Sequence, residues 1–223
     1  MENQIFEKVD NYIIDLFATE DDALLQTRNS IELLGIMQQS ISPIQGKFLQ
    51  TMMMACNAKR VLELGTFVGY SAIWMAKALP QNGKLISIDF DIKVASLAQK
   101  NIEATGLFEK VELKVGKALE ILPELIAEKV EPFDMIFIDA DKPPYKEYFK
   151  YALELSRPGT IIIIDNVIRS GKVLDENPSD ERVVGVKRLN QYLTECKEVT
   201  AIILQSSGIK DHDGMAVVVV NRS

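Results

Sequence analysis

The chain has 223 residues, of which 47% are hydrophobic, and no Ser/Gly/Pro-rich linker divides it, so we expect one domain over residues 1–223. Its formal net charge of -7 and pI near 4.9 argue against wholesale binding to nucleic acid or to an anionic membrane, and suit a small or cationic ligand better. Only two cysteines, no signal-like N-terminal segment and no apolar run of about 20 residues predict a cytoplasmic protein with free thiols.

Residues 1–40 are predicted to form a helical cap ahead of the first strand. Apolar residues recur at helical spacing over residues 3–18, which predicts an amphipathic helix. Residues 19–22 are typical of the cap and acidic first turn of a second helix that ends near Met37. Ser42-Pro43 then opens a third helix. The two leading helices could cover a substrate or a second subunit, or they could seal one end of a sheet.

Residues 60–71 (RVLELGTFVGYS) predict a strand, a glycine-containing turn and a helix that runs to about Leu79. Gly65 and Gly69 permit a tight turn and the close approach of a ligand to the backbone. Their spacing differs from that of the dinucleotide fingerprint and of the P-loop. Glu63 lies at the strand end, where a carboxylate would suit a ligand that carries a sulfonium or amino group.

A second strand is predicted over residues 84–89, and it ends in Asp89. A carboxylate at this position of an α/β sheet can accept both hydrogen bonds of a ribose diol. A helix over residues 91–105 and a third strand over residues 111–115 follow. Residues 116–118 (GKA) then turn into a helix that reaches about Glu128.

Two apolar runs, residues 135–138 (MIFI) and 160–164 (TIIII), are typical of strands buried on both faces of a parallel sheet. A helix over residues 145–156 separates them. Asp139 follows the first run, and Asp165 and Asn166 follow the second. The carboxyl ends of parallel strands meet at one rim of a sheet, where ligands bind. These hard oxygen donors predict a divalent-metal site, and Lys142 lies three residues after the first of them.

The end of the chain is predicted to close the sheet in the opposite direction. Residues 169–182 form a polar loop that can overhang the rim, and residues 185–196 form a helix. Two last strands follow over residues 199–204 and 215–220. The Asp213-Gly214 pair is a turn signal before the final strand, which favours an antiparallel finish.

With these motifs in this order, the chain resembles the cation-dependent O-methyltransferases, a family that includes the caffeoyl-coenzyme A and catechol O-methyltransferases. The resemblance extends from about Ile41 to the C-terminus. It implies an α/β fold with a seven-stranded class I S-adenosylmethionine-dependent methyltransferase (Rossmann-like) sheet, an antiparallel last strand and extra N-terminal helices. It also implies a homodimer with the N-terminal helices near the substrate.

The resemblance further implies a role for each matching residue. Asp139, Asp165 and Asn166 would hold the divalent cation (Mg²⁺, with Mn²⁺ or Ca²⁺ as alternatives), and Lys142 would be the general base beside Asp139. The cofactor, S-adenosylmethionine, would contact residues that line one side of the rim: Glu63, Gly65 and Ser71 at its amino acid end, Asp89 at the ribose, Ala118 at the adenine, and Asp139, Asp141 and Ile41 elsewhere.

The predicted reaction is methyl transfer from S-adenosylmethionine to one hydroxyl of a catechol-like vicinal diol that the cation chelates. Two alternatives stay open: methylation of a hydroxylated uridine in tRNA, which the acidic balance opposes, and a non-catalytic nucleoside-binding module. Each acid alone could be a helix cap, and Lys142 could be an exposed lysine. Arg169 stands close after the Asp-Asn pair, near the position where plant members carry a tryptophan, and could meet an anionic substituent or point to solvent.

Trp74 is expected to pack in the core, and His212, the only histidine, to lie in a solvated turn without a chemical role. Tyr145 and Tyr148 could pack their helix or face the cofactor. Gln45 stands where the plant enzymes carry a glutamate.

Overall fold

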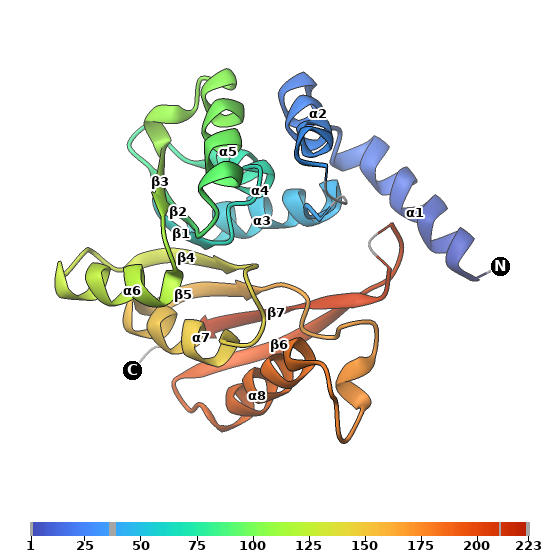
Figure 1. Ribbon diagram of the computed structural model, residues 1–223, viewed down its shortest axis with the longest axis vertical. Helices are drawn as coiled ribbons and strands as arrows, with labels where there is room; N and C mark the ends of the chain where they lie inside the picture. The colour runs from blue at the N-terminus through green and yellow to red at the C-terminus, as the bar shows by residue number, and fades with distance from the viewer. Residues whose placement is uncertain (1, 36–38, 210, 222–223) are drawn as a thin grey trace.

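A seven-stranded sheet with helices on both faces forms the protein (Figure 1). The computed structural model describes residues 2–35, 39–209 and 211–221. The strands are β1 (Arg60–Leu64), β2 (Lys84–Asp89), β3 (Val111–Val115), β4 (Phe133–Ile138), β5 (Ser156–Ile164), β6 (Val199–Ser206) and β7 (Asp213–Val220). The helices are α1 (Glu2–Phe17), α2 (Asp22–Asn29), α3 (Pro43–Ala55), α4 (Tyr70–Ala78), α5 (Ile92–Ala104), α6 (Ala118–Ala127), α7 (Tyr145–Glu154) and α8 (Glu181–Glu195), with short 3₁₀ turns η1 (Ser30–Leu34), η2 (Phe108–Lys110) and η3 (Lys172–Leu174).

The strand order is β3-β2-β1-β4-β5-β7-β6. Strands β1 to β5 pair in parallel, whereas β7 pairs antiparallel with both β5 and β6. The structure therefore confirms the predicted α/β sheet with a reversed last strand. The chain order reverses between β1 and β4, which is the place where sheets of this kind bind ligands at the carboxyl ends of their strands.

Alternating residues of the strands fill two separate cores. Leu62, Ile136 and Ile162 face α6, α7 and α8, and Val61, Phe137 and Ile163 face the layer that contains α2 to α5. Every residue of β4 is buried, as predicted for a central parallel strand. No helix in the described part of the chain has the length and apolar character that crossing a membrane requires.

Several predicted boundaries differ from the structure. The helix predicted over residues 185–196 begins at Glu181, inside the predicted polar loop. The prediction that β5 begins at Thr160 is wrong: the strand begins at Ser156, which pairs with Phe133 ahead of a register shift, and the Thr160 hydroxyl donates to the Phe133 carbonyl. Asp213-Gly214 is not a turn, because both residues pair with β6 inside β7. The second helix ends at Asn29 and continues as η1, and its predicted end at Met37 lies outside the described residues.

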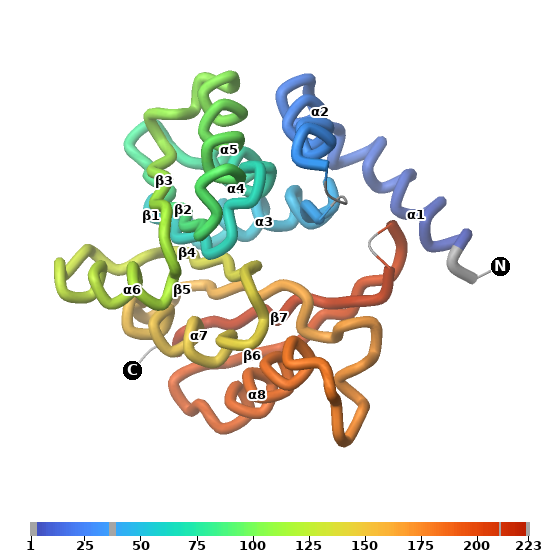
Figure 2. The backbone as a smooth tube through the Cα atoms, viewed as in Figure 1, coloured from blue at the N-terminus to red at the C-terminus, as the bar shows by residue number. Residues whose placement is uncertain are grey.

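The N-terminal helices precede the sheet, as predicted (Figure 2). Asp21 caps α2 by accepting from the Leu24 amide. Helix α1 contacts α3, and the Asp10 carboxylate accepts from the Ile209 amide at 2.9 Å, which ties α1 to the turn between β6 and β7. Large apolar side chains of α1 are nevertheless exposed: Ile5, Phe6, Val9, Tyr12, Leu16 and Phe17. This helix therefore presents an uncovered apolar surface.

Gly65, which follows β1, has no room for a side chain. Its φ is +98°, and a Cβ atom here would lie 2.0 Å from the carbonyl oxygen of Asp139. The positive φ agrees with the predicted tight turn, and the Asp139 backbone lies where a side chain would be. The close approach of a ligand to this backbone stays a prediction. The glycine therefore lets the ends of β1 and β4 meet.

Gly65→Ala should lower the free energy of unfolding by about 2–5 kcal/mol, from about 1–2 kcal/mol of left-handed backbone strain and about 1–3 kcal/mol of overpacking. Gly159→Ala is the matched control, because Gly159 has φ +91° and nothing within 4 Å of its Cβ position. Urea denaturation measures both losses. Equal losses would show that the Asp139 carbonyl accommodates the extra methyl group.

Candidate active site

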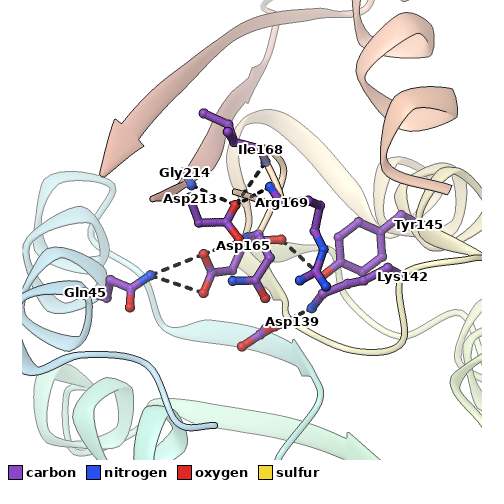
Figure 3. Close-up of polar contacts among 10 residues, drawn as sticks. Gln45, Asp139, Lys142, Tyr145, Asp165, Ile168, Arg169, Asp213 and Gly214 are labelled. Carbon is purple, nitrogen blue, oxygen red and sulfur yellow. Dashed lines mark hydrogen bonds and ion pairs between the residues drawn. The ribbon is translucent and has the colours of Figure 1, made fainter. Parts of the chain in front are cut away.

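Asp139, Lys142 and Asp165 meet at the carboxyl ends of β4 and β5 (Figure 3). The Lys142 ammonium lies 2.7 Å from Asp139 Oδ1, and Lys142 is buried. Asp165 is fully buried, and its Oδ1 accepts from the Asn166 amide at 2.8 Å. The structure therefore brings Asp139, Asp165 and the predicted base together at one rim, and the backbone amide of Asn166 binds Asp165.

Gln45 of α3 holds the Asp165 carboxylate. Its Nε2 donates to both carboxylate oxygens at 3.2 Å, and its Oε1 accepts from the Ser42 amide at 2.8 Å. Ser42 and Gln45 together form the capping box of α3. One side chain therefore closes a helix terminus and orients the predicted metal ligand.

Burial and a neighbouring acid both raise the pKa of the Asp165 carboxyl. Burial raises its pKa to about 7, and the neighbouring negative charge of Asp139 adds to the shift, while the Lys142 ammonium opposes it. Gln45 supplies neutral hydrogen bonds and no positive charge. The direct side-chain partner of the Asp165 carboxylate is therefore neutral.

Tyr145 forms the floor beneath these residues. It is fully buried, its hydroxyl donates to the backbone carbonyl of Asp165 at 3.2 Å, and the Lys142 ammonium lies 5.0 Å from its ring centroid. Burial keeps its pKa well above the usual value. Tyr148 instead donates to Asp141 at 2.5 Å. Tyr145 therefore supports the rim and does not titrate in the physiological range.

The donor set fits a hard divalent cation. In residues 2–35, 39–209 and 211–221, no three His, Cys, Asp or Glu side chains gather as metal ligands. Asp139 and Asp165 are two carboxylates, and Asn166 adds an amide as a third oxygen donor. Carboxylate and amide oxygens are the ligands that Mg²⁺ and Ca²⁺ prefer, and a cation between two close acids would relieve their repulsion.

Glu63 lies in a buried network of hydroxyl groups. Ser71 Oγ and Ser87 Oγ both donate to its carboxylate, the latter at 2.5 Å, and the Thr66 and Ser87 hydroxyls are 2.6 Å apart. Burial raises the Glu63 pKa to about 8, although these hydrogen bonds oppose the shift. The predicted pair of Glu63 and Ser71 is therefore in contact, and its remaining partners are neutral.

Asp89 stands at the end of β2, with both carboxylate oxygens directed to backbone amides. Oδ2 accepts from Phe67 at 2.8 Å and Oδ1 from Asp91 at 3.0 Å. Burial raises its pKa. These bonds fix the carboxylate beside the glycine turn and use only part of its acceptor capacity.

The other predicted cofactor residues are more dispersed. Ala118 is buried at the first position of α6, and Ile41 is buried in the core that contains α2 to α5. Asp141 is exposed and bonded to Tyr148 of α7. Within the described residues, no hydrogen bond joins any of these three to Glu63 or Asp89. Their cofactor roles stay predictions.

Some contacts of the site have a signal in the sequence, and others do not. The cap motif Ser-Pro-Ile-Gln could have revealed the bond between Ser42 and Gln45, but no local signal shows the contact of Gln45 with Asp165, 120 positions away. Ser87 could have been found as a hydroxyl in the middle of an apolar strand. Trp74 is buried and His212 is exposed, as expected.

A hollow of about 500 Å³ lies at the opposite end of the sheet, where β1 to β4 begin. Its cationic side chains already have partners. The Arg60 guanidinium lies 3.8 Å from Glu131, Lys114 pairs with Glu112 at 3.0 Å, and Lys84 donates to the Glu109 carbonyl. The three cationic side chains that line this hollow therefore already have partners.

Comparisons with known proteins agree with this geometry. A family model described as O-methyltransferase matches residues 17–219. The chain is 57% identical to the catechol O-methyltransferase of Niastella koreensis, across 99% of this chain and 100% of that protein. The O-methyltransferase TomG of Streptomyces achromogenes, solved with S-adenosylmethionine, has a TM-score of 0.96 and 39% identity with full coverage of both chains. A Bacillus cereus O-methyltransferase in complex with S-adenosylhomocysteine has a TM-score of 0.94 and 40% identity, with 98% of this chain and 99% of that chain covered.

Glu63→Gln should flatten the dependence of stability on pH. The unfolded carboxyl ionises near pH 4.5, whereas the folded one keeps its proton until about pH 8, so the free energy of unfolding should fall across this interval. Urea denaturation at pH 5, 6.5 and 8 measures the effect. The matched control is Glu124→Gln, which removes a carboxylate from an exposed position of α6. If the free energy of unfolding fell equally with pH in wild type and Glu63→Gln, the raised pKa of Glu63 would be contradicted.

Proposed function

The chain belongs to the O-methyltransferase family, and we propose that it transfers the methyl group of S-adenosylmethionine to one hydroxyl of a catechol-like vicinal diol with a divalent cation, most simply Mg²⁺. The observation that carries the proposal is the meeting of Asp139, Lys142 and Asp165 at one rim of the sheet. Glu63 and Asp89 stand at the ends of the neighbouring strands β1 and β2.

On the cofactor side, the sheet offers negative and neutral hydrogen-bonding groups. Asp89 would accept from the ribose hydroxyls with its free acceptor capacity, and Glu63 would face the cationic amino acid end. Ala118 would pack against the adenine. S-adenosylmethionine supplies an electrophilic methyl group on a sulfonium when bound. A buried carboxylate that is satisfied only by hydroxyl groups suits such a positive charge better than one already paired with a cation.

On the acceptor side, Asp139, Asp165 and Asn166 would hold the cation, and Gln45 keeps the Asp165 carboxylate in position. A bound divalent cation lowers the pKa of a chelated diol and fixes its orientation. Lys142 Nζ now donates to Asp139. It would take the acceptor proton as the neutral amine, since a cation bound at Asp139 would displace the ammonium and disfavour its positive charge. Tyr145 lies below them, where its hydroxyl donates to the Asp165 carbonyl.

We also propose that the protein works as a homodimer in the cytoplasm. The exposed apolar face of α1 is a surface that a second copy could cover. Cys56 and Cys196 are free and half-buried, which suits a reducing compartment.

Removal of the cation should abolish methyl transfer. Wild type is incubated with labelled S-adenosylmethionine, Mg²⁺ and a panel of catechols, flavonoids and bulk tRNA, with and without EDTA. Asp165→Ala should lower kcat/KM for a catechol by at least about 10²-fold, since orientation and nucleophile activation both depend on the cation. The control is Asp22→Ala, in an exposed first turn of α2. Activity that survives both EDTA and Asp165→Ala would overturn the cation mechanism, and labelling of tRNA alone would overturn the catechol acceptor.

Asp89→Asn should separate cofactor binding from cation binding. The affinity for S-adenosylhomocysteine in calorimetry should fall about 10- to 100-fold, because hydrogen bonds to a charged group are replaced by weaker ones. Mn²⁺ binding, followed by electron paramagnetic resonance, should be unchanged. An unaltered cofactor titration would remove Asp89 from the proposed site.

A further inference from the structure

Arg169 lies at the rim without an anionic partner. Its Nε atom is buried and has no hydrogen-bond acceptor among the described residues, and within the same part of the chain no carboxylate lies within 4.0 Å of its guanidinium. A partly buried guanidinium loses hydration that only an anionic or hydrogen-bonding partner restores. Arg169 therefore has an unmet requirement for an acceptor.

The acids around Arg169 are already engaged. Its charge reaches the Asp180 carboxylate and the Tyr145 hydroxyl only at longer range. Each nearby carboxylate has a closer partner: Asp139 has Lys142, Asp180 has Arg182 at 2.7 Å, Asp165 has Gln45, and Asp213 accepts from three backbone amides. The protein itself therefore leaves the guanidinium available.

The loop that carries Arg169 is held in an unusual backbone conformation. Asn166, Arg169 and Ser170 all have positive φ, between 55° and 58°. Asp213 Oδ1 fixes this conformation by accepting from the Ile168 and Arg169 amides at 3.0 Å. Non-glycine residues with positive φ cluster at functional sites, where surrounding contacts hold them. The loop directs the Arg169 side chain toward Tyr145 and Lys142 (Figure 3).

We propose that Arg169 binds a carboxylate substituent of the methyl acceptor, so that the preferred substrates are anionic catechols. The inference rests on the proposed function, because it places the acceptor diol at Asp139 and Asp165. A guanidinium matches a carboxylate with two parallel hydrogen bonds. A local cation is also needed here, because the net charge of -7 would otherwise repel an anionic substrate.

The test compares two acceptors that differ only in charge: 3,4-dihydroxybenzoate and its neutral amide, 3,4-dihydroxybenzamide. Wild type, with saturating Mg²⁺ and S-adenosylmethionine, should show a kcat/KM about 10- to 100-fold higher for the benzoate. Arg169→Gln should remove this preference and leave kcat/KM for the benzamide within about threefold. Arg169→Lys should retain part of it, because the charge remains without the planar fork.

Lys172→Gln is the matched control, because it removes an exposed cation from the same loop and should keep the preference. The benzamide rate reports whether each variant keeps an intact site. Equal losses on both acceptors in Arg169→Gln, or no charge preference in wild type, would overturn the inference and leave the proposed function standing. If neither acceptor is methylated, the proposed function fails. Benzoate binding by calorimetry, with Mg²⁺ and S-adenosylhomocysteine, then decides the inference: equal affinities in wild type and Arg169→Gln overturn it.

Discussion

Backbone hydrogen bonds between neighbouring strands, at their carboxyl ends, place the residues of the site side by side. Gly65 donates to Ile88, Asp139 to Leu64, and Asp165 to Ile138, at 2.8–3.0 Å. In each pair, the amide of a residue just past one strand donates to the carbonyl of the last or next-to-last residue of the neighbouring strand. The side chains that follow β1, β4 and β5 are therefore set side by side by strand order alone, and the absence of a side chain at Gly65 lets the β1 and β4 ends close.

The site stabilises its buried acids with neutral groups. Glu63 has two serine hydroxyls and Asp165 has the Gln45 amide, and burial keeps the pKa of each carboxyl high. Asp134, at the other end of the sheet, shows the alternative. Burial alone would raise the Asp134 pKa. Hydrogen bonds from backbone amides and the Arg157 guanidinium outweigh burial, so the pKa is lowered. Acids with neutral partners retain the capacity to stabilise a cationic ligand, whereas an acid paired with arginine has already used it.

The sequence predicted those parts of the molecule that depend on local pattern and strand order. Apolar runs located β4 and β5, and the acids after them were expected at one rim because parallel strands end together. Contacts between distant side chains could not be predicted in this way. The bond between Gln45 and Asp165 requires the packing of α3 on the sheet, and the direction of Arg169 requires the Asp213 carboxylate from β7. The pattern around Gly65 predicted that this position needs a residue without a side chain, but not that the Asp139 backbone lies where the side chain would be.

Charge is divided across the rim, and this division constrains how any ligand can lie there. In the view of Figure 3, Gln45 lies on one side with Asp139 and Asp165. On the other side lie Lys142, Tyr145 and Arg169. The Lys142 ammonium bridges the two sides by pairing with Asp139 at 2.7 Å. A divalent cation that binds Asp139 competes with this pair, so cation binding would weaken the hold on Lys142. The same event would free Lys142 Nζ from Asp139 and disfavour its positive charge, so that the two halves of the rim would act together on one bound molecule.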